Sequence, residues 1–261
     1  MTSKNTSEEV FWNRMTAETL RAKAKDGALV ILPVASTEQH GPHLATGVDT
    51  FLCTEVCRRT AVRVQQHRPV VVAPTVWMGL AEHHVELGGT FTVSLNTWHA
   101  VLHDLCEAIS RAGFEKIVII NGHGGNMAGL TALTTDLTRD LDLAIASASY
   151  WTLASQSGAV AQILEDQEGL IHACEAETSM MMAAHGDLVT EARLGDAVGP
   201  NTGMAEVLSP AIMRWRSFAE LTPSGVLGDA RRATAEKGER LFSVMSQSLA
   251  DALIEGRPWQ A

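Results

Sequence analysis

The chain has 261 residues, of which 20 are basic and 30 are acidic, so its formal net charge is −10. Hydrophobic residues make up 46% and charged residues 19%, which is typical of a folded globular protein and excludes a disordered one. The negative charge argues against nucleic acid or an anionic membrane as a partner. No apolar run approaches the roughly 18 residues that span a bilayer. Four cysteines without a CxxC pair, and no recognisable signal peptide, favour reduced thiols in a cytoplasmic protein.

No repeat or linker divides the sequence, so residues 1–261 are expected to form a single domain. Short continuous apolar runs indicate buried strands, and apolar residues at helical spacing indicate helices. In chain order the pattern predicts a helix over 8–25, a strand over 28–34, a helix over 50–66, a strand over 70–73, a helix over 95–112, a strand over 116–120, a helix over 126–140, a strand over 143–149, and helices over 174–185, 204–219 and 231–254. This alternation predicts an α/β fold with a mostly parallel central sheet flanked by helices.

Two polar loops follow the first and third predicted strands, where ligands bind in open α/β sheets. The loop over 36–49 contains Glu38, His40 and Asp49, and the loop over 121–126 contains His123 between glycines. Oxygen and nitrogen ligands of this kind suit zinc, manganese or ferrous iron, and an aspartate can bridge two ions. Taken singly, each residue has another interpretation. Asp49 could cap the helix that follows it, Glu38 could be a buried, paired carboxylate, and imidazoles have several other uses.

The motifs exclude several other functions. The segment NGHGGNMAG lacks the third glycine of a dinucleotide-binding loop because Met127 stands there. The sequence contains neither a Walker-type phosphate loop nor the G-x-S-x-G turn of many serine hydrolases. Cys53 and Cys57 lie one helical turn apart and are expected to pack as small apolar side chains rather than to bind a metal.

Four segments resemble the creatininase (creatinine amidohydrolase) family: LPVASTEQHGPHLATGVD, IINGHGGN, HACEAETS and SGVLGDARRATAEKGE. They occur in order and together span nearly the whole chain. The resemblance implies a creatininase-like α/β domain, two divalent metal ions per chain (zinc, manganese or iron) and hydrolysis of a C–N amide bond. It also implies a homo-oligomer, which in that family is a ring-like homohexamer.

By the same resemblance, Glu38, Asp49 and His123 would hold one metal ion. His40 and Asp49 would hold the other, so that Asp49 bridges the pair. His172 falls at the position of the family's catalytic histidine and would give a proton to the leaving nitrogen. Its alternative interpretation is a histidine that orients a ligand or caps a helix.

In creatininase a glutamate completes the second metal site at the position of Gly125, so this chain needs another ligand there. We expect Glu175 in HACEAETS to fill that position and to take part in catalysis with His172. Glu177 also matches a glutamate of creatininase, and we expect it to support the ligands through hydrogen bonds rather than to bind a metal.

The resemblance places Trp151, His84 and Gly124 at the substrate. Trp151 matches a tryptophan that lines the creatininase pocket, and His84 lies in AEHHVELGGT, which resembles the family's pocket loop. Gly124 replaces a tyrosine of the metal loop. A second pocket tryptophan has no counterpart here, so the walls that recognise creatinine are not retained.

We therefore expect a metal-dependent amidohydrolase that uses a metal-bridging hydroxide on a small-molecule amide. The expected substrate is a small cyclic amide, a formamide or a related amide. Two alternatives stay open. One is a creatininase-type peptidase that acts in cofactor maturation, and the other is a non-catalytic metal-binding homologue.

Overall fold

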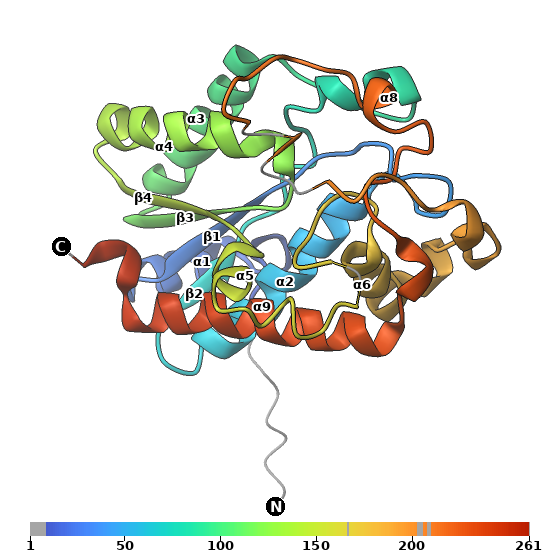
Figure 1. The fold of residues 1–261 in the computed structure, drawn as a ribbon. Helices are drawn as coiled ribbons and strands as arrows, with labels where there is room; N and C mark the ends of the chain where they lie inside the picture. The colour runs from blue at the N-terminus through green and yellow to red at the C-terminus, as the bar shows by residue number, and fades with distance from the viewer. Residues whose placement is uncertain (1–8, 166, 203–205, 208–209, 261) are drawn as a thin grey trace, which may run out of the picture.

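The computed structural model describes residues 9–165, 167–202, 206–207 and 210–260. At its centre is a parallel sheet of four strands in the order β2-β1-β3-β4 (Figure 1). The strands are β1 (Leu29–Val34), β2 (Val70–Val72), β3 (Lys116–Asn121) and β4 (Ala144–Ser149). Helices flank the sheet, so the predicted α/β class is confirmed.

The two central strands are covered on both faces. Every residue of β1 is buried, and in β3 only Lys116 is partly exposed. Such strands read as continuous aliphatic runs because neither face meets water. Their parallel register, from Val30 opposite Ile117 to Val34 opposite Asn121, brings the carboxyl ends of both strands to the same edge of the sheet.

Alternate residues of β1 face two separate hydrophobic clusters. Leu29 and Ile31 belong to the cluster that also includes α2, α6 and α9, whereas Val30 and Leu32 belong to the cluster with α3 and α4. Figure 1 shows α3 and α4 on one side of the sheet and α2 and α9 on the other. The helices are α1 (Ala17–Lys25), α2 (Val48–Val64), α3 (Leu95–Arg111), α4 (Met127–Leu141), α5 (Thr152–Gln156), α6 (Glu175–His185), α8 (Phe218–Leu221) and α9 (Ala235–Glu255).

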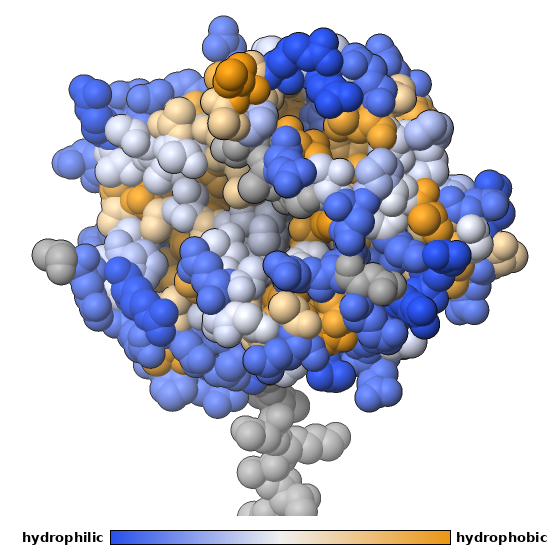
Figure 2. Space-filling view, viewed as in Figure 1, coloured by the Kyte–Doolittle hydropathy of each residue, from blue (hydrophilic) through white to orange (hydrophobic). Residues whose placement is uncertain are grey.

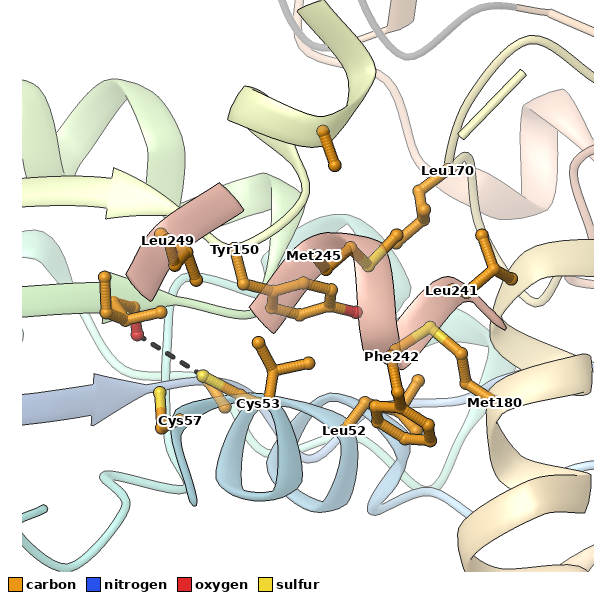
Figure 3. Packing of buried hydrophobic residues seen from close by; sticks show 14 of the residues in the cluster. Leu52, Cys53, Cys57, Tyr150, Leu170, Met180, Leu241, Phe242, Met245 and Leu249 are labelled. Atoms are coloured by element: carbon orange, nitrogen blue, oxygen red, sulfur yellow. Dashed lines mark hydrogen bonds between the residues drawn. The ribbon is translucent and has the colours of Figure 1, made fainter. Parts of the chain in front are cut away.

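The larger cluster joins α2, α6 and α9 around a buried tyrosine. Figure 3 shows Tyr150 between Cys53 of α2 and Met245 of α9. The thiol of Cys53 donates to the carbonyl of Ile120 at 3.3 Å, and all four cysteines are free and buried. These thiols therefore act as apolar packing groups, as expected. At the surface, Figure 2 shows hydrophobic residues set among hydrophilic ones toward the top of the view.

Two predicted helices differ from the structure. The helix predicted over 8–25 begins only at Ala17, because Thr16 caps it by accepting from the N–H of Thr19, and residue 8 lies outside the described residues. The helix predicted over 204–219 is wrong over 210–217, which has no regular structure; residues 203–205 and 208–209 lie outside the described residues. Within the described chain, no helix is both long and apolar enough to cross a bilayer.

Candidate metal centre

The loops that follow β1 and β3 meet at the carboxyl edge of the sheet. From β1 the chain passes to β2 on one side, and from β3 it passes to β4 on the other, so a crevice opens between the two loops. Asn121 ends β3 and fixes the second loop. Its Nδ2 donates to the carbonyl of His123 at 2.7 Å, and its Oδ1 accepts from the N–H of His123 at 3.1 Å. A polar residue at the end of an aliphatic run is a signal that could have indicated this role, which was not predicted.

Glu38, Asp49 and His123 form one cluster of candidate metal ligands. Nδ1 of His123 lies 3.0 Å from Oε2 of Glu38 and 3.0 Å from Oδ2 of Asp49. All three side chains are buried. Asp49 is not the cap of α2, because Gly47 holds that position and Asp49 lies in the first turn of the helix. Its carboxylate is therefore available to the cluster.

His40, Asp49 and Glu177 form a second cluster beside the first. Nε2 of His40 lies 3.2 Å from Oδ1 of Asp49 and 3.9 Å from Oε2 of Glu177. Asp49 belongs to both clusters, with Oδ2 facing His123 and Oδ1 facing His40. If each cluster held an ion, Asp49 would be shared between the two.

The residues present fit divalent metal ions. Among the described residues, Oε2 of Glu38, Nε2 of His40 and Oδ2 of Asp49 are buried polar atoms that make no hydrogen bond, and such atoms are costly unless a ligand satisfies them. Backbone carbonyls orient both histidines. Nδ1 of His40 lies 3.1 Å from the carbonyl of Glu38, and Nε2 of His123 lies 3.3 Å from that of Leu80. If each of these nitrogens donates, the opposite ring nitrogen is free to bind a metal.

The charges of the cluster also favour a cation. Burial alone would raise the pKa of Glu38, but the imidazole of His123 overcomes burial and holds that pKa well below its usual value. Burial likewise opposes a charged His40, yet the neighbouring Asp49 carboxylate raises the pKa of His40 to about 9. Burial raises the pKa of Glu177 to about 7, although His40 opposes that shift. Without metal, the carboxylates thus stabilise the protonated form of the imidazoles beside them. Bound cations would take the place of those protons.

Glu175 does not lie with the candidate ligands. Its carboxylate is 2.6 Å from Nζ of Lys237 and accepts from the backbone N–H of Glu165 at 3.1 Å. It belongs to none of the clusters found among the described residues. Successive residues of an α-helix are rotated by about 100°, so residues two apart face nearly opposite directions. Glu177, rather than Glu175, therefore lies among the candidate ligands.

A strained turn places Glu177. Ala173, between His172 and α6, has a φ of +52°, in the left-handed region. This conformation costs about 1–2 kcal/mol for a residue other than glycine. It aims the N–H of Ala173 at Oε2 of Glu177, at 2.6 Å. The backbone thereby orients the carboxylate that faces His40.

His172 and His84 lie next to the Glu38 carboxylate, and Glu38, His40 and His172 form a third group that could hold a metal ion. Nδ1 of His172 is 3.6 Å from Oε1 of Glu38, and Nε2 of His84 is 3.3 Å from the same oxygen. The other ring nitrogen of His84 contacts the side chain of Gln39 at 2.9 Å. Both ring nitrogens of His84 therefore face protein groups, and the residue also lines the chamber beside the candidate ligands. No motif or spacing in the sequence pointed to Gln39.

The clusters line a small chamber that opens into a larger cleft. The chamber measures about 20 Å³, and the cleft about 1020 Å³. Trp151 and Gly124, both expected at the substrate, line the two cavities. His83 and Phe218 also line both cavities. His83 belongs to the predicted pocket loop, whereas no sequence pattern indicated Phe218. Burial lowers the pKa of His83 to about 3, so its ring is neutral.

Gly125 has no room for a side chain. A Cβ at this position would lie 2.5 Å from Nε2 of His123, 2.5 Å from the carbonyl of Leu80 and 2.6 Å from Cε1 of His83. Contacts this short would force the neighbouring groups to move. The loop therefore depends on glycine at 125, and the ring of His83 occupies part of the space that a larger residue would need.

The sequence and the fold were both compared with those of known proteins. The family model described as creatininase, creatinine amidohydrolase, matches residues 13–253. Creatinine amidohydrolase of Pseudomonas putida is 30% identical over 270 residues, covering 97% of this chain and 99% of that protein. Mycofactocin precursor peptide peptidase of Mycolicibacterium smegmatis is 32% identical over 233 residues, covering 88% of this chain and 86% of that protein.

A solved structure of creatininase with manganese superposes with a TM-score of 0.80 at 28% identity, covering 95% of this chain and 98% of that one. A mutant creatininase of Zn–Zn type superposes with the same TM-score. The match of the family model over most of the chain, and of the fold over nearly all of it, agrees with the clusters of carboxylates and imidazoles at the sheet edge. This chain is thus a member of the creatininase family of metal-dependent amidohydrolases.

Proposed function

We propose that the chain hydrolyses an amide bond in an extended, peptide-like substrate. The observation that carries this proposal is the cleft of about 1020 Å³ that joins the chamber at Gly124, Trp151 and Phe218. Pockets for drug-sized molecules measure about 300–1,000 Å³, so the cleft suits a substrate of several residues better than one small ring. The chamber itself admits little more than the reacting group.

We propose that two ions bind per chain, one to Glu38, Asp49 and His123, the other to His40, Asp49 and Glu177. When bound, such ions make a water molecule nucleophilic near neutral pH and polarise a carbonyl group. Carboxylate and imidazole ligands accept zinc, manganese or iron. Oriented backbone and side-chain partners hold the ligands in place, so the chain contributes a rigid, dry site.

His172 is proposed to carry a proton to the leaving nitrogen. Its ring is buried, and Nδ1 faces the Glu38 carboxylate at the chamber wall. Burial holds the pKa of His172 well below its usual value. The ring is therefore neutral at rest and can accept a proton at Nδ1 before passing it on.

The test is a substrate panel with protein purified without chelator. Creatinine, a formamide and N-acylated short peptides are compared by release of free amine, alongside measured metal content. Peptides are expected to give the highest kcat/KM. A substitution that narrows the cleft, Ala128→Trp on α4, should lower kcat/KM for peptides about tenfold or more and spare the formamide, because Ala128 lines the cleft and not the chamber.

The matched control is Ala100→Trp, which adds the same ring to an exposed alanine of α3 that does not line the cleft. A preference for creatinine that survives Ala128→Trp would refute the peptide-like substrate and favour a small cyclic amide. Bound metal without turnover of any compound would instead favour the non-catalytic homologue.

We further propose a cytoplasmic homo-oligomer, the hexamer being the state implied by family resemblance. The free, buried thiols support a reducing compartment. Trp77 and Phe91 are 47% and 60% exposed, and their rings contact each other edge-on at 5.6 Å. Exposed aromatic patches commonly mark protein contacts. Light scattering should show a smaller assembly for Phe91→Ser than for the wild type; an unchanged mass would refute this contact.

A further inference from the structure

Gln39 stands between two candidate metal ligands in the sequence, and its own side chain is buried among loops from distant parts of the chain. Its exposed fraction is 7%. The side-chain amide contacts the rings of His84 and His172 and the backbone of Gly41 and Gly225. Gln39 belongs to none of the clusters of candidate ligands in the described chain. Its contacts therefore need another explanation.

Two backbone groups fix the orientation of the Gln39 amide. The N–H of Gly41, which can only donate, lies 3.0 Å from Oε1. The carbonyl of Gly225, which can only accept, lies 3.2 Å from Nε2. Exchanging the oxygen and the nitrogen would leave both contacts repulsive. The amide nitrogen of Gln39 therefore faces the two histidines.

This orientation determines the tautomer of His84. Nε2 of Gln39 carries two hydrogens, of which one is donated to Gly225 and the other to Nδ1 of His84 at 2.9 Å. A ring nitrogen that accepts a hydrogen bond carries no proton, so the proton of a neutral His84 is on Nε2. That nitrogen lies 3.3 Å from Oε1 of Glu38. His84 consequently donates to the carboxylate of a candidate ligand.

The same reasoning applies to His172. Its Nε2 lies 3.0 Å from the amide nitrogen of Gln39 and 2.9 Å from the main-chain carbonyl of Gln39. Both amide hydrogens are already donated, and the carbonyl needs a donor, so the proton of His172 is on Nε2. The unprotonated Nδ1 then faces Glu38, 3.6 Å from Oε1.

We propose that Gln39 is a positioning residue that fixes the tautomers of both histidines, so that His84 holds the Glu38 carboxylate and His172 turns an unprotonated Nδ1 toward the metal centre. Gly225 makes room for this arrangement. Its φ is +74°, and a Cβ there would lie 2.1 Å from Oε1 of Gln39. The effect on turnover rests on the proposed hydrolysis, whereas the tautomers are measurable without any substrate.

The test uses Zn²⁺-loaded protein labelled with ¹⁵N-histidine. Long-range ¹H–¹⁵N spectra distinguish a proton on Nδ1 from one on Nε2, and the spectra of His84→Gln and His172→Gln assign the two rings. In the wild type both rings should carry the proton on Nε2. In Gln39→Leu, Nδ1 of His84 loses its donor, so its ¹⁵N resonance should move to that of a ring nitrogen without a hydrogen bond, while the proton stays on Nε2 against Glu38 and the zinc content stays unchanged. With the best substrate of the panel, kcat should fall about 10–100-fold, and KM should change less.

Gln39→Glu provides a second variant of nearly the same shape. A carboxylate cannot donate to His84, so Nδ1 of His84 should become a donor. Gln66→Leu, at an exposed glutamine of the segment after α2, is the control that should change nothing. The wild-type tautomer of His84 in Gln39→Glu, or an unchanged Nδ1 resonance in Gln39→Leu, would overturn the proposal. Loss of zinc from Gln39→Leu would also overturn it, since Gln39 would then act on metal binding instead. If the protein turned over none of the compounds, the proposed function would be refuted. The tautomers of His84 and His172 would still test the role of Gln39.

Discussion

Replacing Glu175 and Glu177 in turn by glutamine separates a structural carboxylate from a metal-binding one. Glu177→Gln removes the charge that faces His40 at 3.9 Å. We expect this variant to lose one of two metal ions per chain and at least about 100-fold in kcat, because an amide is a much weaker ligand than a carboxylate and ligation is part of the catalytic site. Glu175→Gln should keep both ions, because Glu175 faces Lys237 instead.

The expected effects on the free energy of unfolding have the opposite order, with Glu175→Gln the more destabilising of the two substitutions. Removing one partner of a buried ion pair costs about 3–5 kcal/mol. Lys237 is 12% exposed and keeps Oε1 of Glu165 at 2.5 Å and the carbonyl of Arg232 at 2.7 Å. Glu175→Gln should therefore cost less, about 2–3 kcal/mol, or about 5–10 °C in Tm for a chain of this size. In metal-free protein at pH 8, Glu177→Gln should not lower Tm, because a buried carboxylate whose pKa is raised to about 7 destabilises the fold when ionised.

Elemental analysis and thermal unfolding of both variants, with and without chelator, provide the measurement. Surface variants lose neither ions nor much stability, so Glu236→Gln, at an exposed position in the first turn of α9, is a suitable control. If Glu175→Gln lost an ion while Glu177→Gln retained two, the assignment of the ligands would be reversed and the orientation of α6 described above would be incorrect.

Three further predictions concern the same site. Asp49→Asn should empty both metal positions together, because Asp49 is shared by both clusters, and the loss of a single ion would rule out bridging. His172→Ala should lower kcat about 10²–10⁴-fold with unchanged metal content; unaltered turnover would remove His172 from the mechanism. Gly125→Ala should destabilise the protein by about 1–3 kcal/mol, as overpacking does, since its Cβ would meet His123 and the Leu80 carbonyl at 2.5 Å. Denaturant unfolding of the metal-free protein measures this loss of stability. An unchanged denaturant midpoint would show that the loop accommodates a methyl group without cost.

The strands and the loops that carry most of the site follow directly from the sequence. The aliphatic runs match β1 and β3 to within about one residue, because a strand buried on both faces has no alternative pattern. The segment over 210–217 has apolar residues at helical spacing, yet Ile212 is 88% exposed and Trp215 is 56% exposed. Helical periodicity stabilises a helix only where the apolar face finds a partner.

The remaining site residues depend on contacts between distant segments. Glu175 and Glu177 lie two apart on one helix, so only one can face the metal centre, and the sequence does not specify the rotation of α6. Gln39 is an ordinary polar residue in its local sequence. Its partners His84, His172 and Gly225 come from three other segments, so its role becomes visible only when the chain is folded.

The chamber and the cleft are built from different parts of the chain. The candidate ligands stand on the loops after β1 and β3 and at the start of α2 and α6, whereas much of the cleft wall comes from α4, α5 and residues 206–207 and 210–221. Substitutions in the wall can thus change which molecules reach the ions without altering how the ions are held. A fold divided in this way can diversify in substrate choice while its reaction chemistry stays constant, and the irregular segment over 210–217 is the part of the wall least constrained by regular hydrogen bonding.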